Sequence, residues 1–247
     1  MKTWRLWVGM GLAASWSLNA AAYTIEDDYW GAEPTGGNYE DLIGGTNFEI
    51  QGIDVAFYSG MMEVKVFTNY SEPESSFGTE YGDLFISTDG WTPYGTGLDN
   101  YDSDNASNGE DWEFAFDTDA GTLVQISEEA ILKSDYFFAD TGYIYRSGQE
   151  TQVNDSSGAG AYDPVLKDKS WIDLNHVGFG GHLTYHIDLA SLGVSAGDEL
   201  GLHWNMTCAN DTVEGSVSVP EPGTLAMFGL GLAGLGWTRA RRRRATG

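Results

Sequence analysis

The sequence predicts an all-β fold, an antiparallel β-sandwich or jelly-roll-like single domain, with one further helix expected near each end of the chain. Several segments alternate apolar and polar residues with a period of two, whereas helical periodicity is weak. The segments are separated by clusters such as SEPESSFG, TDGWTPYGTG and NDSSGAGAYDP, which are rich in residues that favour turns.

The alternation is clearest in GHLTYHIDL, residues 181–189, and in ELGLHWNMTC, residues 199–208. This pattern is typical of strands with one buried and one solvated face. The histidines of these strands, His182, His186 and His203, are therefore expected to face solvent. Trp204 and Cys208 fall on the apolar faces, where we expect a core indole and a buried thiol.

Three other segments extend the strand pattern. MEVKVFT, residues 62–68, and GDLFIST, residues 82–88, carry apolar residues on both faces, which predicts central strands. In DWEFAFD, residues 111–117, the spacing places Trp112, Phe114 and Phe116 on one face. The polar segment that follows residue 209 is interpreted as a stalk.

The N-terminal end has the organisation of a secretory signal. Lys2 and Arg5 precede a mostly apolar run, and the small residues Ala20-Ala21-Ala22 follow it. This order predicts removal by signal peptidase, with Ala20 and Ala22 at the cleavage site. The mature chain is then expected to begin at Tyr23, outside the cytoplasm.

The C-terminal end combines three features in order. Pro220 and Pro222 hold a short segment extended and accessible to a protease. The 17 residues 222–238 are uncharged and glycine-rich, close to the lower limit of about 17 residues for a transmembrane helix. By the positive-inside rule, the basic residues that follow would stay in the cytoplasm: Arg239, Arg241, Arg242, Arg243 and Arg244.

Together, Val219-Pro220-Glu221-Pro222, the apolar span and the terminal arginines resemble the PEP-CTERM sorting signal. The resemblance covers residues 219–247. It implies a protein of a Gram-negative bacterium that is exported through the inner membrane and anchored there transiently. The membrane protease exosortase would then process it for the cell surface or the extracellular space, usually in species that make exopolysaccharide. The same tail is also labelled an ice-binding protein C-terminal domain, a name that implies nothing about the body.

These features divide the chain into a signal peptide (1–22), an acidic β-sandwich domain (23–209), a stalk or linker (210–218) and the sorting signal (219–247). The chain has 12 basic and 37 acidic residues, of which 5 and 36 fall in residues 23–219, a net charge there of −31. This charge argues against nucleic acids and anionic membrane surfaces as partners of the body and favours divalent cations. With one cysteine in the chain, no intrachain disulfide is expected.

A calcium site is one hypothesis. In DNYDSDNASNGED, five oxygen-bearing side chains occupy positions 1, 3, 5, 9 and 12 of an EF-hand-like loop: Asn100, Asp102, Asp104, Asn108 and Asp111. Position 6 is Asn105 instead of Gly, position 12 is Asp instead of Glu, and no helices flank the loop, so we exclude an EF-hand. A looser calcium site and a solvated acidic loop remain the alternatives.

Catalytic chemistry finds little support. His182 and His186 would lie about 13 Å apart on a strand, at about 3.3 Å per residue, too far to share a zinc ion without a bulge. No Gly-x-Ser-x-Gly motif is present. We therefore assign no catalytic residue and do not expect an enzyme.

Sugar stacking is the remaining hypothesis for a site. Trp91 and Tyr94 lie in a turn-rich segment, where they are better surface candidates than Trp112 and Trp204, which are expected in the core. The sequence thus favours a structural or adhesive surface or matrix protein that works among exopolysaccharides. A secreted carbohydrate-binding module is the alternative, and a glycan hydrolase is less favoured.

Overall fold

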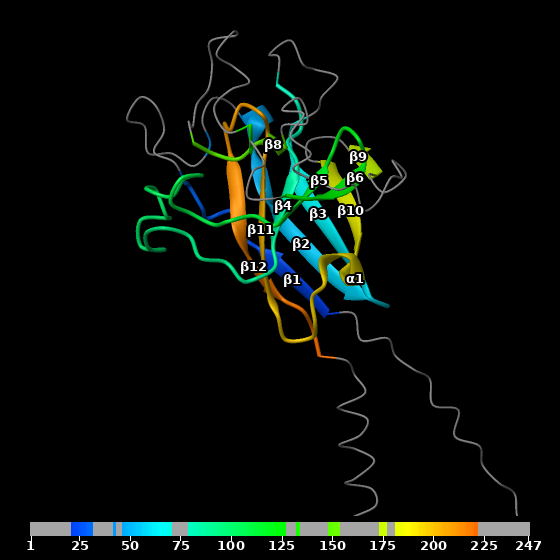
Figure 1. The fold of residues 1–247 in the computed structure, drawn as a ribbon. Coiled ribbons are helices and arrows are strands. Elements are labelled where there is room, and N and C mark those ends of the chain that lie inside the picture. Colours follow the sequence, from blue (N-terminus) through cyan, green and yellow to red (C-terminus); the bar gives the residue numbers. More distant parts are fainter. Residues whose placement is uncertain are drawn as a thin grey trace, which may run out of the picture.

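The computed structural model describes residues 21–31, 42, 46–70, 79–126, 132–133, 148–153, 173–176 and 181–221. These residues form two five-stranded antiparallel sheets, with a two-stranded pair beside them (Figure 1). Helix in this part of the chain amounts to a 3-10 turn and one four-residue α-helix. The predicted all-β sandwich is confirmed, and the helices expected near the two ends fall outside the described residues.

The first sheet has the order β1-β2-β3-β10-β9 and the second has the order β12-β11-β4-β5-β6. The bounds of the first sheet's strands are β1 Ala21–Ile25, β2 Ile50–Tyr58, β3 Met61–Thr68, β9 Asp173–His176 and β10 Gly181–Asp188. Those of the second are β4 Leu84–Ser87, β5 Phe114–Asp117, β6 Thr122–Gln125, β11 Glu199–Asn205 and β12 Thr212–Ser218. The small pair is β7 Leu132–Lys133 with β8 Gln152–Val153, and the helical turns are η1 Thr46–Phe48 and α1 Leu189–Leu192.

The main core lies between the two sheets and follows the predicted alternation. Leu183, Tyr185 and Ile187 of β10 are at most 1% exposed, and Leu200, Leu202 and Trp204 of β11 are fully buried. Across the core, the Trp204 indole Nε1 donates a hydrogen bond of 3.0 Å to the Tyr185 hydroxyl. The prediction for β3 and β4 is also confirmed, because each is the third of five strands in its sheet.

The prediction of a stalk over residues 210–218 is wrong. Thr212–Ser218 form β12, which pairs with β11 from Asn205 opposite Thr212 to Glu199 opposite Ser218. Val213 and Val217 point into the main core and are at most 3% exposed. The polar residues Thr212 and Glu214 on the other face are also at most 3% exposed, because this part of the strand faces a second buried layer instead of solvent.

That second layer covers the outer face of the second sheet. Residues 88–113 and 148–153 supply it, and its apolar contacts join Phe85, Trp112, Ala115, Val124 and Val153. Trp112 is 7% exposed and packs against Phe85, so its predicted burial is correct but its predicted face is wrong. Because β5 begins only at Phe114, the strand alternation does not extend back to Trp112.

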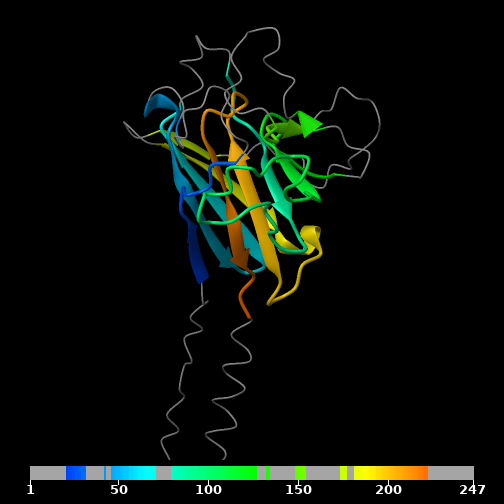
Figure 2. The same ribbon diagram turned by 90° about the vertical axis from the view of Figure 1, so that its left-hand side faces the viewer.

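The first and last strands of the sandwich, β1 and β12, have their outer termini at the same end of the domain. Figures 1 and 2, which differ by a quarter turn, both place the start of β1 and the end of β12 at the lower end of the sandwich. Along this edge, Gly215 of β12 faces Ile25 of β1 so closely that a Cβ atom at Gly215 would lie 2.6 Å from the Ile25 Cγ2. At the other end of the edge, the Ile50 amide donates to the Asp211 Oδ2 at 2.6 Å.

The close approach of β1 to β12 predicts a steric effect. Gly215→Ala should lower the free energy of unfolding by about 1–3 kcal/mol, because the added methyl group overpacks this edge. Denaturant unfolding of Gly215→Ala, Ile25→Ala and the double variant would measure it. A double variant that shows the sum of the two single effects would contradict the contact.

Candidate functional site

A row of side chains crosses the outer face of the second sheet. Strand register aligns Glu214 of β12, His203 of β11, Phe85 of β4, Ala115 of β5 and Val124 of β6. All five side chains are at most 3% exposed. The row is therefore buried throughout, and it changes from charged at β12 to apolar at β6.

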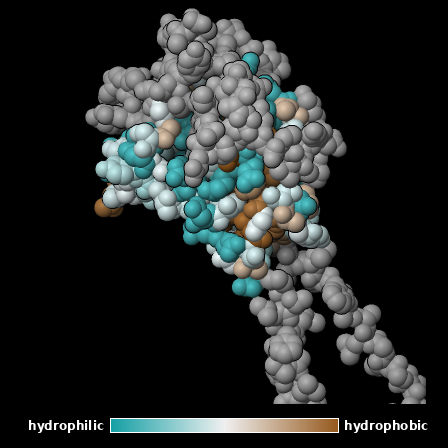
Figure 3. Space-filling model, in the orientation of Figure 1, coloured by the Kyte–Doolittle hydropathy of each residue, from teal (hydrophilic) through white to brown (hydrophobic). Residues whose placement is uncertain are grey.

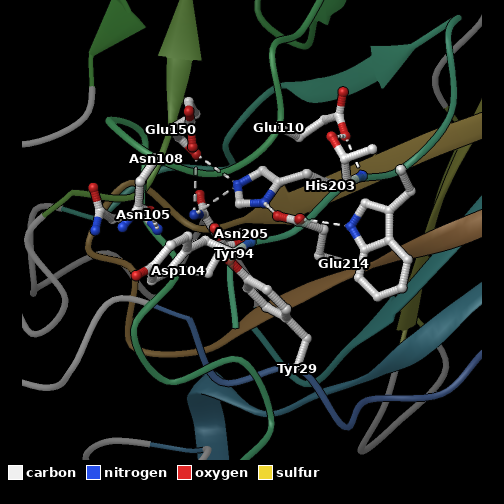
Figure 4. Close-up of polar contacts among 12 residues, drawn as sticks. Tyr29, Tyr94, Asp104, Asn105, Asn108, Glu110, Glu150, His203, Asn205 and Glu214 are labelled. Atoms are coloured by element: carbon white, nitrogen blue, oxygen red, sulfur yellow. Dashed lines mark hydrogen bonds and ion pairs between the residues drawn. The ribbon is translucent and has the colours of Figure 1, made fainter. Parts of the chain in front are cut away.

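His203 is the centre of the polar half (Figure 4). Its Nδ1 lies 2.7 Å from a Glu214 carboxylate oxygen, and its Nε2 lies 2.8 Å from the backbone oxygen of Glu150. A carbonyl oxygen can only accept, so Nε2 carries a hydrogen, while Nδ1 faces a carboxylate. Burial alone would lower the pKa of His203, but the hydrogen bond and charge of Glu214, with the charge of Glu150, raise it instead. The geometry fits an imidazolium paired with a carboxylate.

The prediction that His203 faces solvent is wrong, because residues 148–153 and the loop over residues 88–113 cover its side of the sheet. His182 and His186, on the outer face of the first sheet, are partly exposed as expected. His186 Nδ1 lies 3.1 Å from the Tyr58 hydroxyl and 3.7 Å from a Glu63 carboxylate oxygen.

Buried or partly buried carboxylates fasten the covering loop to the sheet. Glu214 accepts a hydrogen bond of 2.7 Å from the Trp91 indole nitrogen. Glu110 accepts from the hydroxyls of Ser87 and Thr92 at 3.0 and 2.9 Å, and also from the Thr92 amide. A loop that covers a sheet buries backbone N–H groups, and these carboxylates supply acceptors for such groups.

Asp104 makes a further connection, between the loop and the segment that follows β1. Its carboxylate accepts from the Tyr94 amide at 2.9 Å and from the Tyr29 hydroxyl at 2.8 Å. Burial, with the charge of Glu214, raises the pKa of Asp104 to about 6. Burial also raises the pKa of Glu150 to about 7, with His203 opposing and Glu214 assisting.

Asp83 has a similar role beside β8. Its oxygens accept from the amides of Thr118 and Val153 at 2.8 and 2.7 Å. Burial, together with the charge of Asp117, raises the pKa of Asp83 to about 8. Asp83 thus connects β4, the turn after β5 and β8.

The structure separates the two aromatic residues that were expected to stack on sugars. Trp91 is partly buried, anchored by Glu214, and packs edge-on against Tyr101 at 5.3 Å between ring centroids. Tyr94 is 55% exposed and Leu98 is 98% exposed. The fastened loop therefore presents Tyr94 and Leu98 to solvent, while Trp91 holds the loop in place.

The five calcium candidates do not form a ligand set in which every oxygen is available. Both oxygens of Asp104 accept the hydrogen bonds described above, and the Asn108 side-chain oxygen accepts from the Asn105 amide at 2.9 Å. Asp102 accepts from the Ser103 hydroxyl, Asp111 is exposed, and Asn100 is partly buried. Among the described residues, no three His, Cys, Asp or Glu side chains are grouped to hold a metal ion. Calcium binding stays a prediction.

Cys208 is 2% exposed, and burial raises the pKa of its thiol, as expected for a structural cysteine. Among the residues expected to direct export, Ala22 lies in β1 opposite Ala56, and Ala20 falls outside the described residues. Val219, Pro220 and Glu221 are described, and Pro222 and the five arginines are not. Within the described ranges, no helix is long and apolar enough to cross a membrane. The segment predicted to do so, 222–238, lies beyond them.

Sequence reasoning missed the His203–Glu214 pair because residues 210–218 were assigned to a stalk. One signal could have revealed it. If residues 199–205 and 212–218 are taken as a hairpin, His203 and Glu214 stand directly opposite each other. An acid opposite a histidine on neighbouring strands favours an ion pair.

The buried ion pair predicts a large loss of stability when its acid is removed. Glu214→Ala should lower the free energy of unfolding by about 3–5 kcal/mol, because it leaves a buried imidazolium and the Trp91 donor without a partner. Glu199→Ala, at the exposed end of β11, is the matched control and should change it by less than about 0.5 kcal/mol. Equal effects in urea unfolding would contradict the network.

The raised pKa values predict a fold that is more stable in acid. Between pH 4 and 8, the unfolded chain releases protons that Asp104, Glu150 and Asp83 retain when folded, so stability falls as the pH rises. His203 acts in the same direction, because its raised pKa adds stability below its ordinary value that is lost at higher pH. We expect the free energy of unfolding to fall by at least about 2 kcal/mol over this range.

Urea titrations at each pH would check this fall. Glu150→Gln should flatten the profile between pH 4.5 and 7, because it removes the proton that Glu150 holds up to about pH 7. The same change at the exposed Glu199 should leave the profile as it is. A stability that rises from pH 4 to 8 would contradict the assignment.

Comparison with known proteins bears on the tail. Residues 218–244 match the family model of the PEP-CTERM protein-sorting motif. No curated protein and no solved structure matches the chain. The match confirms the resemblance seen in Val219-Pro220-Glu221-Pro222 and the terminal arginines. The chain therefore carries a PEP-CTERM sorting motif, which marks it as an exported surface or extracellular protein that exosortase processes.

Proposed function

We propose that the body is a structural or adhesive module that works among exopolysaccharides at the cell surface or in the extracellular matrix. The observation that carries the proposal is a surface loop that is hydrogen-bonded to the sheet and exposes two large side chains, Tyr94 and Leu98. On the face drawn in Figure 3, the described residues are mostly teal or white, with a brown hydrophobic patch near the lower end of the sandwich. An exposed aromatic side chain on a loop whose backbone is held by hydrogen bonds suits contact with sugar rings, because the loop loses less conformational entropy on binding.

The position of the chain ends supports this arrangement. The start of β1 and the end of β12 lie at one end of the sandwich, so the sorting motif leaves from that end (Figures 1 and 2). The covering loop lies along a side face, over β11 and β4. A module tethered through its C-terminal end would thus keep the loop free for contacts.

Charge supports a part for divalent cations. Residues 23–219 carry a net charge of −31, and this charge would repel anionic polysaccharides unless cations bridged the two. Calcium is the cation that the loop over residues 100–111 would suit, through carboxylate and amide oxygens. Bridging needs no preformed ligand cage, so it is compatible with hydrogen-bonded Asp104 and Asn108.

We propose no catalytic activity for the body. A histidine that acts as a general base needs one ring nitrogen within reach of the substrate or of a bound water. His203 is fully buried and both of its ring nitrogens have partners within 2.8 Å.

The adhesive proposal predicts cation-dependent retention. Mature protein mixed with exopolysaccharide from a producing strain should sediment with it in millimolar calcium and return to the supernatant on chelation. Calcium should also raise the melting temperature if the loop binds it. Sedimentation that is the same with and without chelator would contradict cation bridging.

Specific sugar binding is the second candidate function, and the 55% exposure of Tyr94 favours it. A carbohydrate-binding module should bind a glycan array saturably, and Tyr94→Ala should weaken that binding by about 3- to 10-fold through loss of one stacking contact. Leu98→Ala is the matched control, since Leu98 is exposed on the same loop but offers no ring. Equal binding by both variants would contradict stacking on Tyr94.

A further inference from the structure

We propose that exosortase cuts this chain after Glu221 or further toward the C-terminus, and that a backbone clasp on Val219 sets this limit. The clasp consists of the hydrogen bonds between Val219 and the turn formed by residues 195–198. The proposal rests on the sorting function indicated by the PEP-CTERM motif. It further specifies which peptide bonds exosortase can reach while the domain is folded.

The clasp continues the fold beyond the end of β12 at Ser218. The Val219 amide donates to the Asp198 backbone oxygen at 2.8 Å, and the Gly197 amide donates to the Val219 backbone oxygen at 2.8 Å. The turn itself is fixed, because the Ser195 amide donates to the Asp198 carboxylate at 2.7 Å. Both backbone polar groups of Val219 are thus engaged.

The Val219 side chain is also part of the main core. It is 5% exposed, whereas Pro220 is partly buried and Glu221 is exposed. The matched motif begins at residue 218, inside this folded region. No spacer therefore separates the sandwich from the residues that exosortase recognises.

A protease binds an extended peptide on both sides of the bond that it cuts, through backbone hydrogen bonds that resemble strand addition. Backbone that is already paired within a fold becomes available only when that part of the fold opens. While the clasp is closed, the backbone N–H and C=O of Val219 are not available to hydrogen-bond with the protease. Pro220 and Glu221 are the first residues free of it, so the bond to be cut follows them.

A cut at this position also preserves the domain. β12, Val219 and the clasp stay on the mature protein, so the core loses none of its members on processing. A cut before Val219 would instead expose Gly197 and Asp198 backbone groups and remove a core side chain.

The test uses the full chain, expressed with exosortase in a host that processes such tails. Intact-mass and C-terminal peptide spectrometry of the processed protein should give Glu221 or a later residue as the C-terminus. A C-terminus at Pro220 or earlier would overturn the proposal. A chain left uncut by exosortase would overturn the sorting function on which the proposal rests, so the two failures are distinguishable.

A second pair of variants tests the clasp without touching the motif. Gly197→Pro removes the N–H that bonds to Val219 and cannot adopt the φ of +92° at this position. Gly193→Pro is the matched control, because Gly193 also has a positive φ, of +72°, and its amide bonds to Ala190 instead. With both variants shown to be folded by circular dichroism, C-terminal peptide spectrometry should find chains that end at Pro220 or earlier in Gly197→Pro alone, because only this variant releases Val219.

Hydrogen exchange at Val219 keeps the test independent of how well Gly197→Pro folds. In the wild-type chain before processing, the Val219 amide should exchange as slowly as its β12 neighbours. Exchange as fast as that of an unfolded peptide would overturn the clasp, as would the same C-terminal residues in the two proline variants when both are folded.

Discussion

The pairing of β12 with β11 is the interaction on which the rest of the structure depends. One face of β12 sends Val213 and Val217 into the core between the sheets, and the other sends Glu214 to His203 under the covering loop. The strand then runs through Val219 into the sorting motif. A single hairpin therefore connects the core, the buried polar layer and the start of the segment that exosortase processes.

The polar layer is needed because both faces of the second sheet are covered. A loop laid over a sheet brings N–H groups away from water, and each needs an acceptor. Asp104 and Asp83 supply acceptors to the amides of Tyr94 and Val153, but their carboxylates are buried as a result. Burying a charged carboxylate is unfavourable and raises the pKa values of both acids, so protonation in acid removes this unfavourable contribution to the free energy of folding.

The sequence-based predictions succeeded where one local pattern determines the outcome. Alternation identified the inward residues of β10 and β11, and two-sided apolar composition identified β3 and β4 as central strands. They failed where the environment of a face depends on distant segments. His203 is buried because residues 88–113 and 148–153 cover its face of the sheet, and Trp112 belongs to that covering layer. Local periodicity does not indicate which loop will lie over which face. Trp91 shows the same limit, since a turn-rich context suggests exposure but cannot reveal Glu214 as its partner.

Native-state hydrogen exchange of the β11–β12 hairpin tests this account most directly. If β12 holds the domain together, the amides of Val213, Gly215 and Val217 should exchange only on global unfolding, with the same opening free energy as those of the central strand β4. Their protection should also fall in parallel with global stability as the pH rises. If the β12 amides exchange with an opening free energy well below that of global unfolding, β12 behaves as a mobile tether and the account is contradicted.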